Sequence, residues 1–302
     1  MDIKEALEYG IEKLKESNIQ EPSLKARLVL AYLLNKNKEY LMVHYEEKLK
    51  ASIKEKYMEA ITKLCENEPL QYITNKQEFM GLEFYVDENV LIPQPDTEVL
   101  VEEVINIANG ILQKKTVGVD GLGDSQKNIQ ILDLCTGSGA IGISIAKNIK
   151  NCNVTLSDIS KGALNIAKRN AVGAGLCSAR NTDNTIKIIQ SDLFENINNK
   201  FDIIVSNPPY IKTEIIKTLD KEVHKEPKLA LDGGKDGLEI YRRIINEAYR
   251  YLNNDGYLCL EIGYDQKEEV INLLKNAKAY TQIYSKKDLS RKDRIIVSKK
   301  EN

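Results

Sequence analysis

The chain has 302 residues, 42% of them hydrophobic and 29% charged, which is typical of a globular protein long enough for two domains. The formal net charge of −2 argues against an overall cationic field that would recruit nucleic acid. The five cysteines include no CxxC pair, so with only two histidines we expect reduced thiols and no metal site. The N-terminus lacks the features of a signal peptide, and no apolar run approaches the roughly 20 residues that span a membrane. We therefore expect a soluble, cytoplasmic protein.

Residues 1–75 carry helical patterns only. Asp2 and Glu5 form a capping-box pattern ahead of apolar residues at helical spacing, and Pro22 can open a second helix. Two further helices are predicted near 39–45 and 51–64. The segment holds 12 Lys and Arg against 13 Asp and Glu, so it is close to neutral. We expect a small helical bundle, better suited to gripping a protein than a phosphate backbone, and interpret it as a substrate-docking domain.

In residues 76–95 the spacing of the apolar residues changes from that of a helix to that of a strand. Alternating apolar residues around Gly81 predict a β-hairpin that links two domains. The stiff segment 91–98, Leu-Ile-Pro-Gln-Pro-Asp-Thr-Glu, then leads into a helix that Asp96 or Thr97 can cap.

Residues 96–302 are predicted to form an α/β domain. From Ile129 onward strands alternate with helices, which indicates a mainly parallel, Rossmann-like sheet. Polar surface insertions are expected at 113–128 and 174–185. The strands are predicted at 129–134, 153–157, 186–190, 202–206, 256–262, 280–285 and 293–298, and the helices near 139–149, 160–173, 236–252 and 265–276.

A glycine-rich turn, Asp-Leu-Cys-Thr-Gly-Ser-Gly from Asp133 to Gly139, follows the first of these strands and opens a helix. Its glycines allow a tight turn, and the start of the helix offers free N–H groups to a ligand. Such a turn alone can bind NAD, a phosphate or nothing. There is no GxGxxG, and the Asp133 carboxylate would repel a pyrophosphate but attract an ammonium or sulfonium group. The turn therefore favours S-adenosylmethionine over a dinucleotide.

Acidic residues also follow the next two predicted strands. Asp158, about 20 residues further on, can accept both hydroxyls of a ribose, although a lone aspartate there is more often a helix cap. Asp192 can accept from an adenine amino group while Leu193 packs on the ring; alone, Asp192 could equally be a solvated loop residue. The series Asp133, Asp158, Asp192 and Asn207 at successive strand ends is much harder to attribute to chance.

The segment 203–210, Ile-Ile-Val-Ser-Asn-Pro-Pro-Tyr, predicts a buried strand that must stop at Asn207, because the two prolines cannot donate to a ladder. The Asn207 side chain and the backbone carbonyls of Asn207 and Pro208 can accept hydrogen bonds, and Tyr210 adds a flat face. The corner suits a planar amino group. The plainer interpretation is a tight proline turn that closes a strand.

Together these residues resemble the release-factor glutamine methyltransferases, the HemK/PrmC family, over nearly the whole chain. The segments that carry the resemblance are 79–84, 92–98, 133–139, 207–210, 226–231, 233–238 and 261–263. The family usually has arginine at the position of Gln94 and glycine at that of Cys135.

The resemblance implies a seven-stranded S-adenosylmethionine-dependent methyltransferase fold behind a small helical bundle. It also implies roles for residues at the strand ends. The cofactor would be held by Asp133, Leu134, Cys135, Thr136, Gly137, Gly139, Asp158, Asp192, Leu193 and Asn207. The substrate glutamine would be held by Asn207, Pro208, Pro209 and Tyr210, of which Asn207, Pro208 and Tyr210 would be catalytic.

The implied reaction is methylation of the glutamine side-chain amide in the Gly-Gly-Gln loop of a peptide-chain release factor. The Asn-Pro-Pro-Tyr corner alone is shared by amino-group methyltransferases that act on DNA, RNA and protein. One alternative is therefore a methyltransferase for adenine or cytosine in nucleic acid, which would need a basic groove. A second alternative is a binding module that keeps the fold without the activity; Asn207, Asp133 and Asp158 argue against it.

Overall fold

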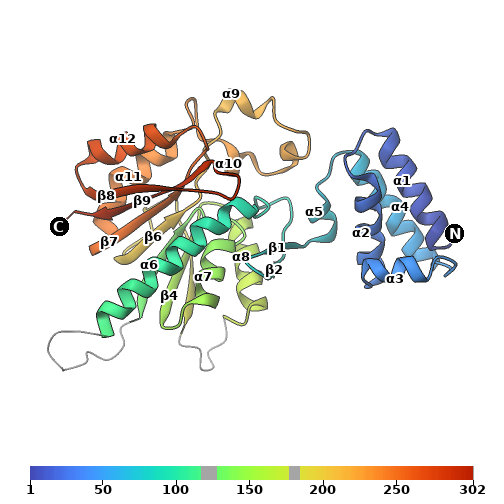
Figure 1. Ribbon diagram of the computed structural model, residues 1–302, viewed down its shortest axis with the longest axis horizontal. Helices are drawn as coiled ribbons and strands as arrows, with labels where there is room; N and C mark the ends of the chain where they lie inside the picture. Colours follow the sequence, from blue (N-terminus) through green and yellow to red (C-terminus); the bar gives the residue numbers. More distant parts are fainter. Residues whose placement is uncertain (117–127, 177–183, 302) are drawn as a thin grey trace. The chain divides into compact units, whose positions relative to one another are not determined.

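The computed structural model describes residues 1–116, 128–176 and 184–301 (Figure 1). The chain divides into two compact units. The first is Met1–Lys76 together with Asp220–Lys225, and the second is Gln77–Leu219 together with Glu226–Asn302. Within the described ranges, no helix combines the length and the apolar character needed to cross a membrane.

The first unit is a helical bundle of α1 (Ile3–Glu16), α2 (Pro22–Leu34), α3 (Lys38–Val43), α4 (Ala51–Cys65) and α5 (Leu70–Thr74). Its core is made by fully buried apolar side chains of α1, α2 and α4. The predicted capping box is present: Asp2 Oδ1 accepts from Glu5 N at 2.9 Å, and Asp2 N donates to Glu5 Oε2 at 2.8 Å. The short α5 was not predicted, because five residues carry too little periodicity.

The second unit contains a seven-stranded sheet, as predicted. Its strands are β3 (Ile129–Leu134), β4 (Cys152–Asp158), β5 (Thr185–Gln190), β6 (Phe201–Ser206), β7 (Leu252–Glu261), β8 (Tyr280–Lys287) and β9 (Asp293–Lys300). Their order is β5-β4-β3-β6-β7-β9-β8. The pairs from β5 to β7 are parallel, and β9 runs antiparallel to both of its neighbours.

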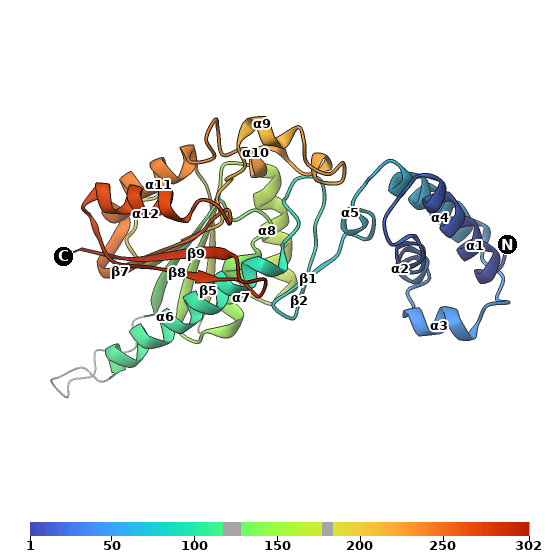
Figure 2. The ribbon, with the colours of Figure 1, turned by 45° about the horizontal axis from the view of Figure 1, so that its top comes forward.

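Helices cover both faces of this sheet (Figures 1 and 2). On one face α6 (Glu98–Thr116), α7 (Ala140–Asn148) and α8 (Lys161–Gly173) contribute to one hydrophobic core, and on the other α11 (Glu239–Tyr251) and α12 (Lys267–Ala277) contribute to a second. Alternation along the strands feeds both cores: Ile131 of β3 lies in the first and Leu132 in the second. The strands are apolar on both sides because both sides are covered.

The segment between the bundle and the sheet differs in detail from the expectation. The hairpin consists only of β1 (Gln77–Phe79) and β2 (Leu82–Phe84). The helical conformation starts at Pro95, in the 3-10 turn η1 (Pro95–Thr97), and so Asp96 and Thr97 are not caps; their side chains bond to Arg294 and Asn207 instead.

The ends of the predicted insertions also differ. Helix α6 continues to Thr116, so 113–116 is helical, and β5 already begins at Thr185. The rest of the two insertions, residues 117–127 and 177–183, lies outside the described residues. Three short elements between β6 and α11 were not predicted: α9 (Thr213–Ile216), η2 (Val223–Lys225) and α10 (Lys228–Leu231).

Candidate active site

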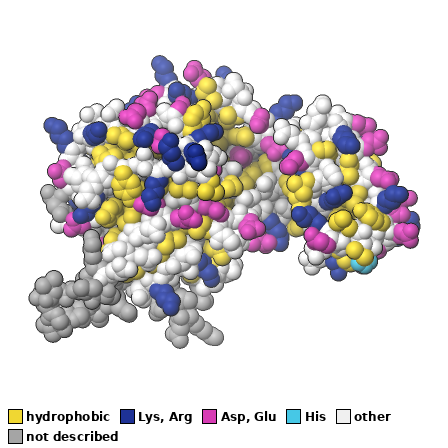
Figure 3. Space-filling model, in the orientation of Figure 1, with side chains coloured by type: hydrophobic (Ala, Val, Ile, Leu, Met, Phe, Trp, Pro, Cys, Tyr) yellow, Lys and Arg dark blue, Asp and Glu magenta, His cyan; other side chains and the backbone are white. Residues whose placement is uncertain are grey.

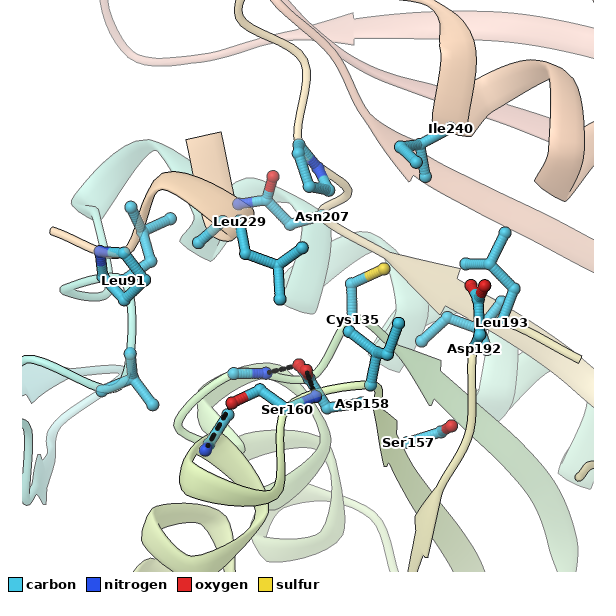
Figure 4. Close-up of a pocket in the computed structure, with 18 of the residues that line it drawn as sticks. Leu91, Cys135, Ser157, Asp158, Ser160, Asp192, Leu193, Asn207, Leu229 and Ile240 are labelled. Atoms are coloured by element: carbon cyan, nitrogen blue, oxygen red, sulfur yellow. Dashed lines mark hydrogen bonds between the residues drawn. The ribbon is translucent and has the colours of Figure 1, made fainter. Parts of the chain in front are cut away.

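A cavity in the second unit opens at the carboxyl ends of β3, β4, β5 and β6 (Figure 4). This is the edge at which open parallel sheets bind ligands. In Figure 4, Asn207 lies above Asp158, Cys135 lies at a height between them, and Asp192 and Leu193 lie to the right. The predicted site residues that line the cavity are Leu134, Cys135, Gly137, Asp158, Asp192, Leu193, Asn207 and Pro209.

The turn after β3 has the tight geometry that its glycines predict. Gly137 and Gly139 have φ of 54° and 83°, in the left-handed region that glycine tolerates best. Cys135 also has a positive φ, 56°. It therefore adopts the conformation of the turn at a backbone cost of about 1–3 kcal/mol.

Asp133 lies beneath this turn and does not line the cavity. Its side chain is fully buried, and Oδ2 accepts from the Thr136 hydroxyl at 2.6 Å and from Gly142 N at 2.9 Å. Burial raises the pKa of Asp133 to about 7. In this structure the carboxyl joins the turn to the first turn of α7, and Thr136 and Gly139 belong to the same framework behind the cavity.

Asp158, the last residue of β4, faces the cavity with a fixed carboxyl group. Oδ2 accepts from Gly137 N at 2.9 Å and Oδ1 from Ser160 N at 2.8 Å (Figure 4). Burial raises the pKa of Asp158, while these backbone N–H groups favour the charged form and lower it. Because each carboxylate oxygen can accept more than one hydrogen bond, both retain capacity for a ligand hydroxyl.

Asp192 follows β5 and lines the cavity beside Leu193, which has a φ of 48°. Arg243 of α11 reaches Asp192 Oδ1 at 2.9 Å. The salt bridge was not predicted, because the two residues are far apart in the sequence.

Later segments of the chain hold the Asn-Pro-Pro-Tyr corner after β6 by hydrogen bonds to its backbone carbonyls and to that of the next residue. Gln266 Nε2 donates to the Tyr210 carbonyl at 2.9 Å, and Gly233 N donates to Ile211 O at 2.8 Å. A Cβ added to Gly233 would lie 2.7 Å from Tyr210 Cα and 2.8 Å from Pro209 O, so only glycine permits this approach. Among the described residues none donates to the carbonyl of Pro208. Pro208 and Tyr210 flank the cavity without lining it.

Sequence reasoning missed a second set of cavity residues. They include the apolar side chains and loop residues Asn89, Val90, Leu91, Ile159, Pro227, Leu229, Ala230 and Ile240. Two of the loops involved are joined where Ile92 N donates to Glu226 Oε2 at 2.9 Å. Burial raises the pKa of Glu226 to about 7. The second loop falls in the segment 226–231, which resembles the family, and the first directly precedes the segment 92–98, so the resemblance was the available signal.

The comparisons with known proteins define the class. Residues 119–288 match the model of the methyltransferase small domain, and residues 5–74 match that of the PrmC N-terminal domain. The catalytic domain of hMettl16, solved in complex with MAT2A 3'UTR hairpin 6, is 12% identical, covers 90% of this chain and 93% of its own, and has a TM-score of 0.56. At that identity it supports the fold alone. The chain is a methyltransferase.

Two relatives narrow the class. The release factor glutamine methyltransferase of Clostridium acetobutylicum is 39% identical over 99% of this chain and 98% of its own length. That of Clostridium botulinum is 38% identical over 99% of this chain and 100% of its own. The chain belongs to the release factor glutamine methyltransferase family.

Proposed function

We propose that this protein transfers a methyl group from S-adenosylmethionine to the side-chain amide nitrogen of the glutamine in the Gly-Gly-Gln loop of a peptide-chain release factor. The observation that carries the proposal is that Asn207, at a corner suited to a planar amino group, lines the same cavity as Asp158. Full-length similarity to release factor glutamine methyltransferases supports the choice of substrate. Such an enzyme works where translation terminates, which supports a cytoplasmic location.

The cavity residues fit S-adenosylmethionine. Asp158 would accept from the ribose hydroxyls, since its oxygens can accept further hydrogen bonds beside those from the Gly137 and Ser160 backbone. Asp192 and Leu193 would contact the adenine, and the turn from Leu134 to Gly137 would lie along the methionine end. Asp133, Thr136 and Gly139 would act on the cofactor by fixing that turn. When bound, S-adenosylmethionine supplies an electrophilic methyl group on a positively charged sulfonium.

The corner at Asn207 would orient the acceptor. An amide nitrogen is a poor nucleophile because its lone pair is delocalised into the carbonyl. Accepting its two hydrogens at the Asn207 side chain and the Pro208 carbonyl would shift electron density to nitrogen and aim the lone pair at the methyl group. Pro209 and Tyr210 would pack against the substrate amide group. Positioning of this kind can contribute roughly 7–11 kcal/mol.

The bond from sulfur to the methyl carbon breaks as the bond from nitrogen to that carbon forms. The methylated nitrogen is strongly acidic, so its surplus proton can pass to water. The proposal therefore requires no dedicated general base.

The helical unit would dock another part of the release factor. It has no candidate catalytic group, and its charges are balanced. On the face seen in Figure 3, the Lys and Arg side chains of this unit are interspersed with Asp and Glu instead of forming one basic patch. This pattern favours a protein partner over a nucleic acid.

The proposal is tested by offering the purified protein different acceptors together with S-adenosylmethionine that carries a labelled methyl group. We expect label in a release factor and none in a release factor whose Gly-Gly-Gln glutamine is replaced by alanine. Duplex DNA and RNA serve as competing acceptors. Faster labelling of either nucleic acid would contradict the proposal and favour an adenine or cytosine methyltransferase.

A further inference from the structure

A buried carboxylic acid, Glu261, lies beside the Asn207 side chain. It is the last residue of β7, and the parallel register that pairs Ser206 with Leu260 places Glu261 level with Asn207 on the neighbouring strand. Its side chain is only 2% exposed. Burying an ionisable carboxyl costs free energy, so a carboxyl in this position calls for an explanation.

Thr97 lies beside the Asn207 side chain. The residue is 4% exposed, and its hydroxyl accepts from Asn207 Nδ2 at 3.4 Å. The Thr97 and Asn207 side chains both lower the pKa of Glu261, which is consistent with their position next to its carboxyl group. Glu261 Oε2 has no hydrogen-bond partner among the described residues. These contacts join three elements, η1, the corner after β6, and the end of β7.

Among the described residues, no salt bridge to Glu261 is present. The positive charge of Arg294 in β9 lowers the pKa of Glu261, but Arg294 already bonds to Asp96 at 2.9 Å and to Asp288 at 3.0 Å. The negative charge of Glu261 raises the pKa of Tyr210. The Tyr241 hydroxyl donates to the backbone carbonyl of Glu261 at 2.7 Å. Burial raises the pKa of Glu261 to about 7, against the opposing effects of the Thr97 and Asn207 side chains and of Arg294.

The orientation of Asn207 matters for the proposed reaction. An asparagine side chain can turn over, which exchanges its acceptor oxygen and its donor nitrogen. The substrate amide NH2 group can only donate hydrogen bonds to the site, so it must meet Asn207 Oδ1, the acceptor, and not Nδ2. An ionised carboxyl accepts hydrogen bonds and cannot donate one, so it selects the orientation with Nδ2 toward Glu261.

We propose that Glu261 is a positioning residue for amide methylation, which, directly and through the Thr97 hydroxyl, fixes Asn207 with Oδ1 toward the substrate. The inference rests on the proposed function and adds to it a residue that does not line the cavity. It makes Asn207 productive only when Glu261 is ionised.

The test compares Glu261→Gln, Thr97→Val and Thr97→Ser in single turnovers at saturating cofactor and release factor. In Glu261→Gln and Thr97→Val the rate of methyl transfer should fall about 10- to 100-fold, the range expected from a misplaced catalytic group, with unchanged cofactor affinity. Thr97→Ser keeps the hydroxyl and should stay near wild type. Glu103→Gln is the matched control, because Glu103 is also a buried carboxylic acid but bonds to the Tyr284 hydroxyl, at 2.6 Å, away from the corner.

The pH profile separates positioning from a structural role. The wild-type rate should rise with pH through about 7 as Glu261 ionises, and Glu261→Gln should lose this rise. A rise that persists in Glu261→Gln would belong to Asp133 or Glu226 and would overturn the inference, as would wild-type rates in Glu261→Gln and Thr97→Val. If Glu261→Gln fails to fold, the difference between Thr97→Val and Thr97→Ser decides. Failure of the wild type to methylate a release factor would instead contradict the proposed function.

Discussion

The Asp158 carboxyl group lines the cavity and also accepts hydrogen bonds from the backbone of Gly137 and Ser160. We expect Asp158→Ala to weaken S-adenosylmethionine binding by roughly 1.5–3 kcal/mol through lost charge-assisted hydrogen bonds to the ribose. Calorimetric titration with the cofactor measures this loss. Asp236→Ala is a suitable control, because Asp236 is an exposed carboxylate paired with Arg242. Unchanged affinity in a folded Asp158→Ala would remove Asp158 from the cofactor site.

Two side chains show the limits of inference from single residues. Asp133 was predicted to contact the cofactor, and in the structure its Oδ2 also accepts hydrogen bonds from Thr136 and Gly142 within the loop framework. Gln94 was given no contact from the sequence, and its side chain donates to the nearby Ile92 carbonyl at 3.0 Å. In both cases the contacts depend on how the backbone turns around the side chain, which the residue type alone does not determine.

At the scale of elements, the corner after β6 depends on the close approach of the chain at Gly233. We expect Gly233→Ala to lower methyl transfer more than cofactor binding, because the added Cβ would collide with the backbone of Pro209 and Tyr210. A displacement on the order of 1 Å can cost about 100-fold in rate. Single-turnover kinetics and cofactor titration measure the two effects.

The control for this change is Gly110→Ala, in α6. A Cβ there meets no atom within 4 Å, so alanine should leave turnover unchanged and stabilise the helix by roughly 0.5–1 kcal/mol. Equal turnover in Gly233→Ala and Gly110→Ala would show that the corner tolerates the displacement.

The elements that sequence reasoning predicted well are the long ones with a clear period. The strand 129–134 was predicted to the residue, because its apolar run is bounded by a polar segment and a glycine-rich turn. The short α9 and α10 were missed, since four residues carry no periodicity. The group of Thr97, Asn207 and Glu261 could not be predicted either, because its members lie on three elements far apart in the sequence.

At the scale of the molecule, the helical unit is predicted to serve the release factor and not the cofactor. Removing residues 1–76 should leave cofactor affinity largely intact while abolishing methylation of the release factor. The truncation also removes Lys25 and Glu68, which pair with Glu222 and Lys225 of the segment Asp220–Lys225. A full-length variant with Glu222→Gln and Lys225→Gln controls for those losses. Normal methylation by a folded truncated protein would show that docking lies elsewhere.

Three buried carboxyls predict how stability depends on pH. Burial raises the pKa values of Asp133, Glu226 and Glu261 to about 7, from ordinary values of 3.8 for Asp and 4.5 for Glu. The folded state therefore holds protons that the unfolded state releases, so stability is greatest near pH 4 to 5 and declines as the pH rises to about 7.

Urea unfolding followed by circular dichroism at pH 5 and pH 8 measures this decline. Glu226→Gln keeps an acceptor for Ile92 N and removes one titrating group, so it should reduce the decline by about 1–3 kcal/mol. Greater stability at pH 8 than at pH 5 would contradict the assigned directions of the three pKa values.

The central claim is that this chain methylates a glutamine side chain at the Asn207 corner. Its most direct test is mass spectrometry of the Gly-Gly-Gln peptide, recovered from a release factor after incubation with S-adenosylmethionine and either wild type or Asn207→Ala. We predict one added methyl group on the glutamine with wild type, and a rate on the order of 10²–10³ lower with Asn207→Ala, as for the loss of one preorganised catalytic hydrogen bond. An unmodified glutamine with wild type, or equal rates for the two proteins, would contradict the account.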